Sequence, residues 1–410
     1  MDFNFLKENQ LEEQLNEIEE QTAELTAVSF SEEGPGLLRY ARFLVYILVF
    51  LVPLFFLPWT SEILEFNKQF LIFVLGVVGL ILYLSQVIRT GHLVIKKSIA
   101  NYAALVFIAT SALASIFSDL RYQSIFGGFN AGFSQSFISS AGFAVFFFLV
   151  LNVFGIQKDS LKKDISKLLT IFGFSLFLTL ILGGLEMFRV PLFELVGITQ
   201  GVFNTAGTFN SLGILAALLL VISFYEFDDD FKYLKYIKLP AALVSLLVLA
   251  ILNWWILWVA GIAGLVLVLV SRSLKNWKIL NYFWPLAIIL VAVVFILLNF
   301  NISDNLKTSQ PVEIAPSFKA SFGISRGALT KDPLFGVGPE NFSLAYDLYK
   351  PLSINNTVFW NLRFSEATSE MFNALTSYGI VGFLAVILLF GAGFKLGRKN
   401  YGLLSVFAVL

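Results

Sequence analysis

The sequence predicts an all-α, polytopic transmembrane helical bundle of about ten full spans and a truncated one, with a large extracytoplasmic loop. Charged residues make up only 14% of the chain, and the mean hydropathy is +0.80, whereas about a quarter of a soluble domain is charged. Apolar runs of roughly 20 residues, the length that crosses a bilayer core as a helix, recur along the chain. Basic residues also alternate between successive loops, as they do across a membrane.

The apolar runs define the predicted spans. The run at 211–227 is short, and a turn near Asn253-Trp254-Trp255 separates two other runs. These two runs form either two full spans or one re-entrant hairpin. The predicted spans lie near 37–58, 69–88, 98–117, 136–156, 166–187, 211–227, 237–253, 255–271, 282–300 and 372–394.

The distribution of lysine and arginine predicts the orientation, because short loops rich in these residues mark the cytoplasmic side. The alternate loops are nearly bare and carry only Lys68, Arg121 and Arg189. The alternation holds along the chain and predicts a cytoplasmic (inner) membrane protein with its N-terminus in the cytoplasm. The basic loops lie at 39–42, 89–97, 158–167, 232–238, 272–278 and 395–399.

Four parts follow from this pattern. Residues 1–36 form an acidic cytoplasmic tail, which either docks a partner or remains solvated. Residues 37–300 form a bundle of nine spans, and residues 301–371 form an extracytoplasmic loop domain. Residues 372–410 hold the C-terminal spans. Because YGLLSVFAVL at 401–410 reads as half of a span, and a carboxylate inside a bilayer is costly, we expect the last span to be truncated here and the natural chain to continue.

The composition excludes several kinds of chemistry. The chain has no cysteine, which excludes disulfides, thiolate catalysis and cysteine metal sites. Its single histidine, His92, excludes a multi-histidine metal site. The formal net charge is zero, so nothing indicates a nucleic-acid partner. We expect neither a metal nor a cofactor.

The loop at 301–371 is the long hydrophilic stretch in which chemistry could occur, since long loops in membrane proteins are usually functional. Residues 317–331 read as a helix that places Lys319 and Arg326, seven residues apart, on one face. The segment DPLFGVGPENF at 332–342 follows, and its glycines permit a tight turn.

A second helix is predicted to begin after Ser365, which is a plausible N-cap. Glu366 and Glu370 are four residues apart and therefore share one face of that helix. Arg363 lies on the same stripe. A structural ion-pair cluster is therefore the alternative to a functional role for these three residues.

The glycine segment of the loop is followed, after a variable stretch, by Gly379-Ile380-Val381-Gly382 at the start of a span. Supporting segments are SIFGGFNAGF at 124–133 and GTFNSLGILA at 207–216. Together these segments resemble the O-antigen ligase and polymerase superfamily of membrane proteins, over roughly residues 37–394. The family's usual Asn-Pro-Asn is replaced here by Ser211-Leu212-Gly213. The motif residues are Pro333, Gly336, Gly338, Phe342, Gly379 and Gly382.

The resemblance implies a helical membrane domain beneath a large periplasmic loop, and metal-independent transfer of a glycan from a polyprenyl diphosphate carrier to an acceptor hydroxyl. Its implied partners are membrane lipids, the polyprenyl diphosphate-linked glycan, and an acceptor lipid or protein. The chain departs from the family twice. Thr368 stands at the position of the family's histidine, and Asn253-Trp254-Trp255 lies where many members have a Ser-Arg pair.

Transfer from a diphosphate requires cations to neutralise the leaving group and a base to take the acceptor proton. We expect Glu366 or Glu370 to be the base, since burial of a carboxylate raises its pKa. The forked guanidinium of arginine suits phosphate oxygens. We expect the diphosphate to be bound by Arg326, Arg363, Lys319 and Arg121.

Two other functions stay open. The missing histidine and arginine favour a non-catalytic relative that binds a glycolipid or acts as a scaffold. Inverted repeats with broken helices near mid-membrane would favour a transporter, and the sequence has no clear internal repeat. An open cavity beneath the loop, lined by Arg326 and another cation, would favour the transferase.

Overall fold

The computed structural model describes residues 35–60, 62–93, 95–128, 135–154, 160–188, 190, 203–225, 234–273, 280–300, 302–303, 313–397, 405–406 and 409. These ranges are helical and contain no strand, which confirms the all-α class. The tail predicted at 1–36 and the half-span predicted at 401–410 lie almost entirely outside the described residues.

Each predicted apolar run coincides with a helix. The break predicted near Asn253 is confirmed, because one helix ends at Leu252 and the next begins at Trp255. In chain order the elements are α2 (Pro35–Leu51), α3 (Glu65–Thr90), α4 (Ile99–Phe117), α5 (Arg121–Phe126), α6 (Phe137–Val153), α7 (Ser160–Met187), α8 (Phe209–Ser223), α9 (Leu234–Leu252), α10 (Trp255–Ser273), α11 (Leu280–Leu298), α13 (Phe318–Lys331), α14 (Phe342–Tyr349), η2 (Leu352–Asn356) and α15 (Glu370–Gly397).

Four of these helices are long and apolar enough to cross a membrane: α3, α4, residues Lys163–Met187 of α7, and α15. Five further apolar helices in the described ranges have 10–17 residues. Several apolar helices of this kind indicate a membrane protein, but ten full spans are not shown. Some helices are shorter than the predicted spans because a proline or an N-cap residue sets where they end or begin. The end of α2 at Leu51 precedes Pro53, and α8 begins only after its N-cap, Thr208.

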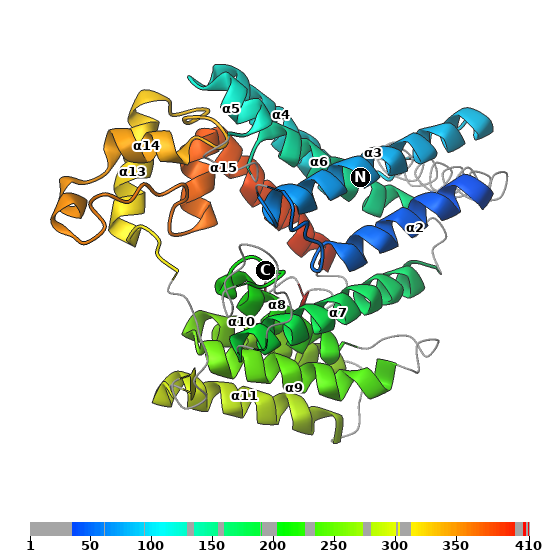
Figure 1. Cartoon of the computed structure of the whole chain (residues 1–410). Coiled ribbons are helices and arrows are strands. Elements are labelled where there is room, and N and C mark those ends of the chain that lie inside the picture. The colour runs from blue at the N-terminus through cyan, green and yellow to red at the C-terminus, as the bar shows by residue number, and fades with distance from the viewer. Residues whose placement is uncertain are drawn as a thin grey trace, which may run out of the picture.

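The helices form two groups, and Figure 1 shows one group above the other. In the upper group α3 packs on α2 and α6, and α4 packs on α6 and α15. In the lower group α8 contacts α7, α9 and α10, and α11 packs on α10. The contact between α2 and α7 joins the two groups.

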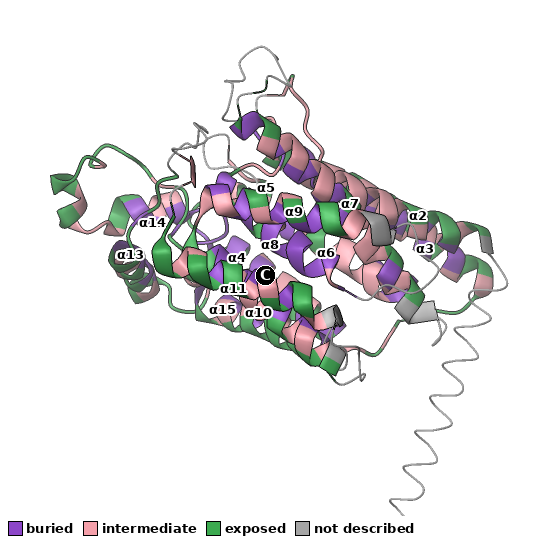
Figure 2. Cartoon of the chain, turned by 90° about the horizontal axis from the view of Figure 1, so that it is seen from below, coloured by how far each residue is buried: buried purple, intermediate pink, exposed green. Residues whose placement is uncertain are grey.

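Helix α8 is the buried centre of the lower group (Figure 2). All residues from Ala216 to Ser223 are buried, because α7, α9 and α10 cover it. Close packing depends on Gly213, where a Cβ would lie 2.3 Å from a methyl carbon of Leu257. Most of α8 is therefore shielded from water.

The region predicted as a loop contains a small helical domain, formed by α13, α14 and η2. Its core includes Ile324, Phe342 and Tyr346, and α13 packs on α15. The helix predicted at 317–331 is confirmed as α13, and the side chain of Ser317 caps it by accepting from the backbone N–H of Ala320 at 3.2 Å. We call residues 313–369 the loop domain.

The helix predicted to begin after Ser365 is wrong, because α15 begins at Glu370. Residues 365–369 are held outside the helix by tertiary hydrogen bonds. The N–H of Ala367 donates to Oδ1 of Asn373 at 2.6 Å, and the N–H of Thr368 donates to Oγ of Ser321 in α13 at 3.0 Å. Glu366 and Glu370 therefore do not share a helical face.

Candidate functional site

Helix α15 is broken at Gly379, whose φ and ψ are 66° and −165°. In an unbroken helix the N–H of Ile380 would donate to the carbonyl of Thr376. Instead, the N–H of Ile380 donates to the carbonyl of Pro333 at 3.0 Å. The carbonyl of Thr376 accepts from the N–H of Val337, also at 3.0 Å.

The next helical hydrogen bond is replaced in the same way. The N–H of Val381 donates to the carbonyl of Leu334 at 3.2 Å, and the carbonyl of Ser377 accepts from the N–H of Gly338 at 3.0 Å. Two helical bonds are thus exchanged for four bonds to the loop domain, and every freed backbone group has a partner. We call residues 333–338 together with the break in α15 the interlock.

The motif glycines make this interlock possible. Gly336 and Gly338 have positive φ angles of 64° and 96°, which side chains rarely adopt. A Cβ at Gly338 would lie 2.4 Å from Oγ of Ser118. A Cβ at Gly382 would lie 2.1 Å from Cβ of Tyr378. The residues that carry the family resemblance therefore have an architectural role in this chain.

The residues after the motif fasten the loop domain to the ends of α4, α5 and α6. The side-chain amide of Asn341 donates to Oγ of Ser118 and of Ser124, at 2.8 Å each. Oε1 of the buried Glu340 accepts from the N–H of Gln135 at 2.6 Å. We refer to this end of the upper helix group as the loop-domain end.

Arg326 lies on the exposed side of α13 and borders an open hollow of about 330 Å³ between α13 and α15. Most of the hollow is apolar, and Arg326 is the only cation among its lining residues in the described chain. This hollow is lined by Arg326, but the second cation that would favour the transferase is not among the lining residues. Its lining residues are Phe322, Ser325, Arg326, Leu329, Thr330 and Leu375.

The other predicted cations do not gather around this hollow. The guanidinium of Arg363 forms an ion pair with Asp347, with Nη2 and Oδ2 2.6 Å apart. It is therefore engaged within the loop domain and does not share a stripe with Glu366 and Glu370. Lys319 and Arg121 are exposed. The described structure gives neither of them a hydrogen-bonded carboxylate partner.

The predicted carboxylates belong to a larger acidic group. Glu366 is exposed, but the surrounding protein partly desolvates it, and this desolvation raises its pKa. The charges of Glu370 and of Glu65, at the first turn of α3, raise that pKa further. Oε1 of Glu370 also accepts a weak hydrogen bond from the amide of Asn373 at 3.4 Å. A carboxyl whose pKa is raised is suited to accept a proton near neutral pH.

Lys68 supplies a cation beside Glu65, one member of this acidic group. It lies one helical turn after Glu65 in α3 and is half-buried. Its ammonium group donates to the backbone carbonyl of Thr205, in the turn that leads into α8. The sequence pattern placed Lys68 only in a loop between two spans, because the position of Thr205 cannot be read from the chain. We define Glu65, Lys68, Glu366 and Glu370 as the candidate site.

The N-terminus of α8 is capped from a distant part of the chain. Oε1 of Glu313 accepts from the N–H of Phe209 at 2.5 Å and from the N–H of Asn210 at 3.3 Å. Oγ1 of Thr208 accepts from the N–H of Ser211 at 2.9 Å. No sequence signal indicated this role of Glu313, since the contact joins residues about a hundred positions apart.

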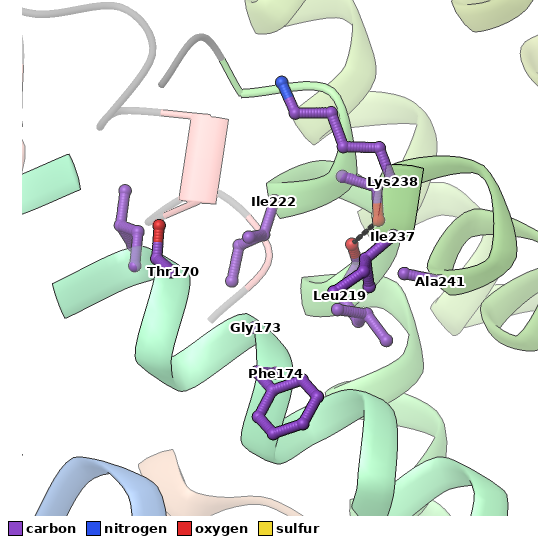
Figure 3. A pocket seen from close by; sticks show the side chains of 10 residues that line it. Thr170, Gly173, Phe174, Leu219, Ile222, Ile237, Lys238 and Ala241 are labelled. Carbon is purple, nitrogen blue, oxygen red and sulfur yellow. Dashed lines mark hydrogen bonds between the residues drawn. The ribbon is translucent and has the colours of Figure 1, made fainter. Parts of the chain in front are cut away.

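A second hollow lies between α7, α8 and α9, and Figure 3 shows the side chains that surround it. Its volume is about 30 Å³, and it is lined mainly by apolar residues such as Phe174, Leu219 and Ile222. This volume is too small for a lipid headgroup or a sugar. The hollow is therefore a packing defect of the lower helix group and does not belong to the candidate site.

The candidate site offers acid–base chemistry from its carboxyls and one cation, Lys68. Within the described ranges, no group of three histidines or carboxylates is arranged to hold a metal ion. The single histidine, His92, lies in the connection between α3 and α4. No protein-family model matches the chain, and no curated protein matches it. The function must therefore be inferred from the chemistry of the site.

Proposed function

We propose that this chain is a membrane glycosyltransferase of the O-antigen ligase type, which moves a glycan from a polyprenyl diphosphate carrier to an acceptor hydroxyl without a metal. The loop domain faces the outside of the cytoplasmic membrane in this proposal, and the N-terminus faces the cytoplasm. The apolar helices support a membrane location. The sequence resemblance and the alternation of basic loops support the transferase class and the orientation.

One observation carries the proposal: Glu366, a carboxyl with a raised pKa, and Lys68, a half-buried lysine, share Glu65 as a neighbour. Glu366 feels the charge of Glu65, and Lys68 follows Glu65 by one turn of the same helix. A base and a cation are the two groups that transfer from a diphosphate requires. Their common neighbour, Glu65, favours catalysis over simple solvation of these charges.

The proposed step uses each group once. The acceptor oxygen attacks the anomeric carbon of the glycan, while the bond from that carbon to the diphosphate oxygen breaks. Glu366 takes the proton of the acceptor hydroxyl. The diphosphate leaves with the electron pair of the broken bond, and the ammonium of Lys68 stabilises its charge. Attack from the opposite face inverts the anomeric carbon.

Replacing Lys68 with methionine tests this proposal in cells. Methionine preserves the helix and the length of the side chain but removes the charge that would stabilise the leaving group. We expect surface glycan made by the chain to fall by about 100-fold or more, as measured by glycan profiling with protein abundance checked on the same cells.

The matched control is Lys395→Met, which makes the same change at an exposed lysine in the last turn of α15. This control should leave the glycan profile unchanged. An unchanged profile in Lys68→Met, at normal protein abundance, would remove the cation from the proposed step.

The pH dependence of transfer provides a second test. Glu366 must be ionised to take a proton, so activity should fall as the pH drops through its raised pKa. The charge of Glu370 contributes to that raised pKa, so Glu370→Gln should lower the pKa of Glu366. We therefore expect the acidic limb of the pH–rate profile to move to lower pH in Glu370→Gln. The control Asp332→Asn, at an exposed carboxyl of the loop domain, should not move it, and a shift to higher pH would contradict the assignment.

A non-catalytic glycolipid-binding protein is the second candidate. The observation that favours it is Thr368, which stands where the family has a histidine and is exposed, with its N–H held by Ser321. Such a protein would bind a polyprenyl diphosphate-linked glycan but release it unchanged. Turnover by the purified protein therefore distinguishes the two candidates.

A further inference from the structure

We propose that the N-terminus of α8 is an anion subsite for the carrier diphosphate, and that the carboxylate of Glu313 occupies it as an internal competitor. The inference rests on the proposed function, because it assigns the diphosphate of that substrate to a place in the structure. It adds a binding site and a form of autoinhibition to the residues already described.

The first argument is the contact itself. Oε1 of Glu313 accepts from two successive N–H groups at the start of α8, at 2.5 Å from Phe209 and 3.3 Å from Asn210. Free N–H groups at a helix N-terminus bind carboxylate and phosphate oxygens in the same way. Other helices surround the body of α8, whereas Thr208 and Asn210 at its start are exposed, so an anion from outside can reach the positive end of the helix dipole.

The second argument is a set of unused polar groups in the turn that leads into the helix. Thr205 is 1% exposed and Asn204 is 2% exposed. In the described chain neither Oγ1 of Thr205 nor Oδ1 of Asn204 has a hydrogen-bond partner. The hydroxyl of Thr205 can donate to a ligand oxygen, whereas Oδ1 of Asn204 can only accept.

Lys68 provides the third argument. Its ammonium reaches the same turn, where it donates to the carbonyl of Thr205. An ammonium has three donors, so the contact with Thr205 leaves others for a ligand. A helix N-terminus, a hydroxyl and a cation are therefore all found at this turn. All three can donate hydrogen bonds to the oxygens of a diphosphate.

The position of Glu313 suits a group that can be displaced. It is exposed and lies in the extended segment before α13, outside both helices. A carboxylate held this way can return to water without moving α8 or the core of the loop domain. An incoming diphosphate carries more charge than one carboxylate and can replace it.

The test measures binding to the purified full chain in lipid nanodiscs by calorimetry, first with inorganic pyrophosphate and then with polyprenyl diphosphate in the nanodisc. Glu313→Gln keeps the size of the side chain but removes its charge. We expect this variant to bind both probes about tenfold more tightly than the unmodified chain. Adding Lys68→Met to Glu313→Gln should reverse the gain.

Several outcomes would overturn the inference. Unchanged or weaker binding in Glu313→Gln would contradict the inference whatever the melting temperature, and a lower melting temperature in that variant would make Glu313 a structural cap only. A gain for inorganic pyrophosphate alone would overturn the assignment to a lipid diphosphate. Neither result depends on turnover, so transfer activity in the unmodified chain would still support the proposed function if this inference failed.

Discussion

Replacing Gly379 with alanine is expected to lower the free energy of unfolding by roughly 2–6 kcal/mol. Its φ of 66° and ψ of −165° lie in a region that essentially only glycine adopts. An added Cβ would lie 2.4 Å from the carbonyl oxygen of Leu334, closer than real contacts permit. Segment 333–338 would have to withdraw, and the hydrogen bonds of the interlock would open together.

Thermal unfolding of the purified protein in detergent measures this effect. Gly391→Ala is the matched control, because Gly391 belongs to the same helix and a Cβ there would meet nothing within 4 Å. We expect that control to change stability by no more than about 1 kcal/mol, in the stabilising direction. Equal melting temperatures for Gly379→Ala and Gly391→Ala would show that the interlock contributes little to the fold.

The second large effect is expected from Glu366→Gln. An amide of the same size cannot take the acceptor proton, and loss of a positioned general base costs about 100- to 10,000-fold in rate. Because substrate binding depends on other residues, we expect kcat for transfer to fall while KM changes little. Rates measured on the purified protein with saturating lipid-linked glycan separate these two quantities.

Asp332→Asn serves as the control for Glu366→Gln, since it neutralises another exposed carboxyl of the loop domain. It should retain the rate of the unmodified chain. If Glu366→Gln kept the rate of the unmodified chain, Glu366 would be excluded as the base and the non-catalytic candidate would be favoured. A rise in KM with constant kcat would instead assign Glu366 to substrate binding.

The helices of the fold could be predicted because their signals are local. Each apolar run became a helix, and the helix predicted at 317–331 is α13. The glycines of the loop motif were predicted to permit a tight backbone path, and Gly336 and Gly338 do have positive φ angles. The pattern could not show that this segment forms hydrogen bonds with the broken helix α15.

The errors arose where distant parts of the chain decide the local structure. Serine is a common N-cap residue, which is why Ser365 was predicted to start the helix. Hydrogen bonds to Asn373 and Ser321 instead hold the following backbone outside the helix. Arg363 was grouped with the glutamates by helical spacing, yet it pairs with Asp347. These contacts join elements that periodicity treats as independent.

The candidate site was predictable only in part. Glu366 and Glu370 were singled out because they flank the position of the family's histidine, and the structure brings Glu366 near Glu65. The importance of Lys68 and Glu313 depends on the turn before α8, to which both reach from other elements. A single sequence does not show that Lys68 and Glu313 reach the same turn, because nothing in the residues next to either of them indicates the contact.

The most direct test of the central claim is turnover by the purified chain in nanodiscs, with a polyprenyl diphosphate-linked glycan, a hydroxyl acceptor and EDTA. The account predicts a glycosylated acceptor and free polyprenyl diphosphate in equal amounts by mass spectrometry, with both nearly lost in Glu366→Gln. Bound but unaltered lipid-linked glycan, or equal product from the variant, would contradict it.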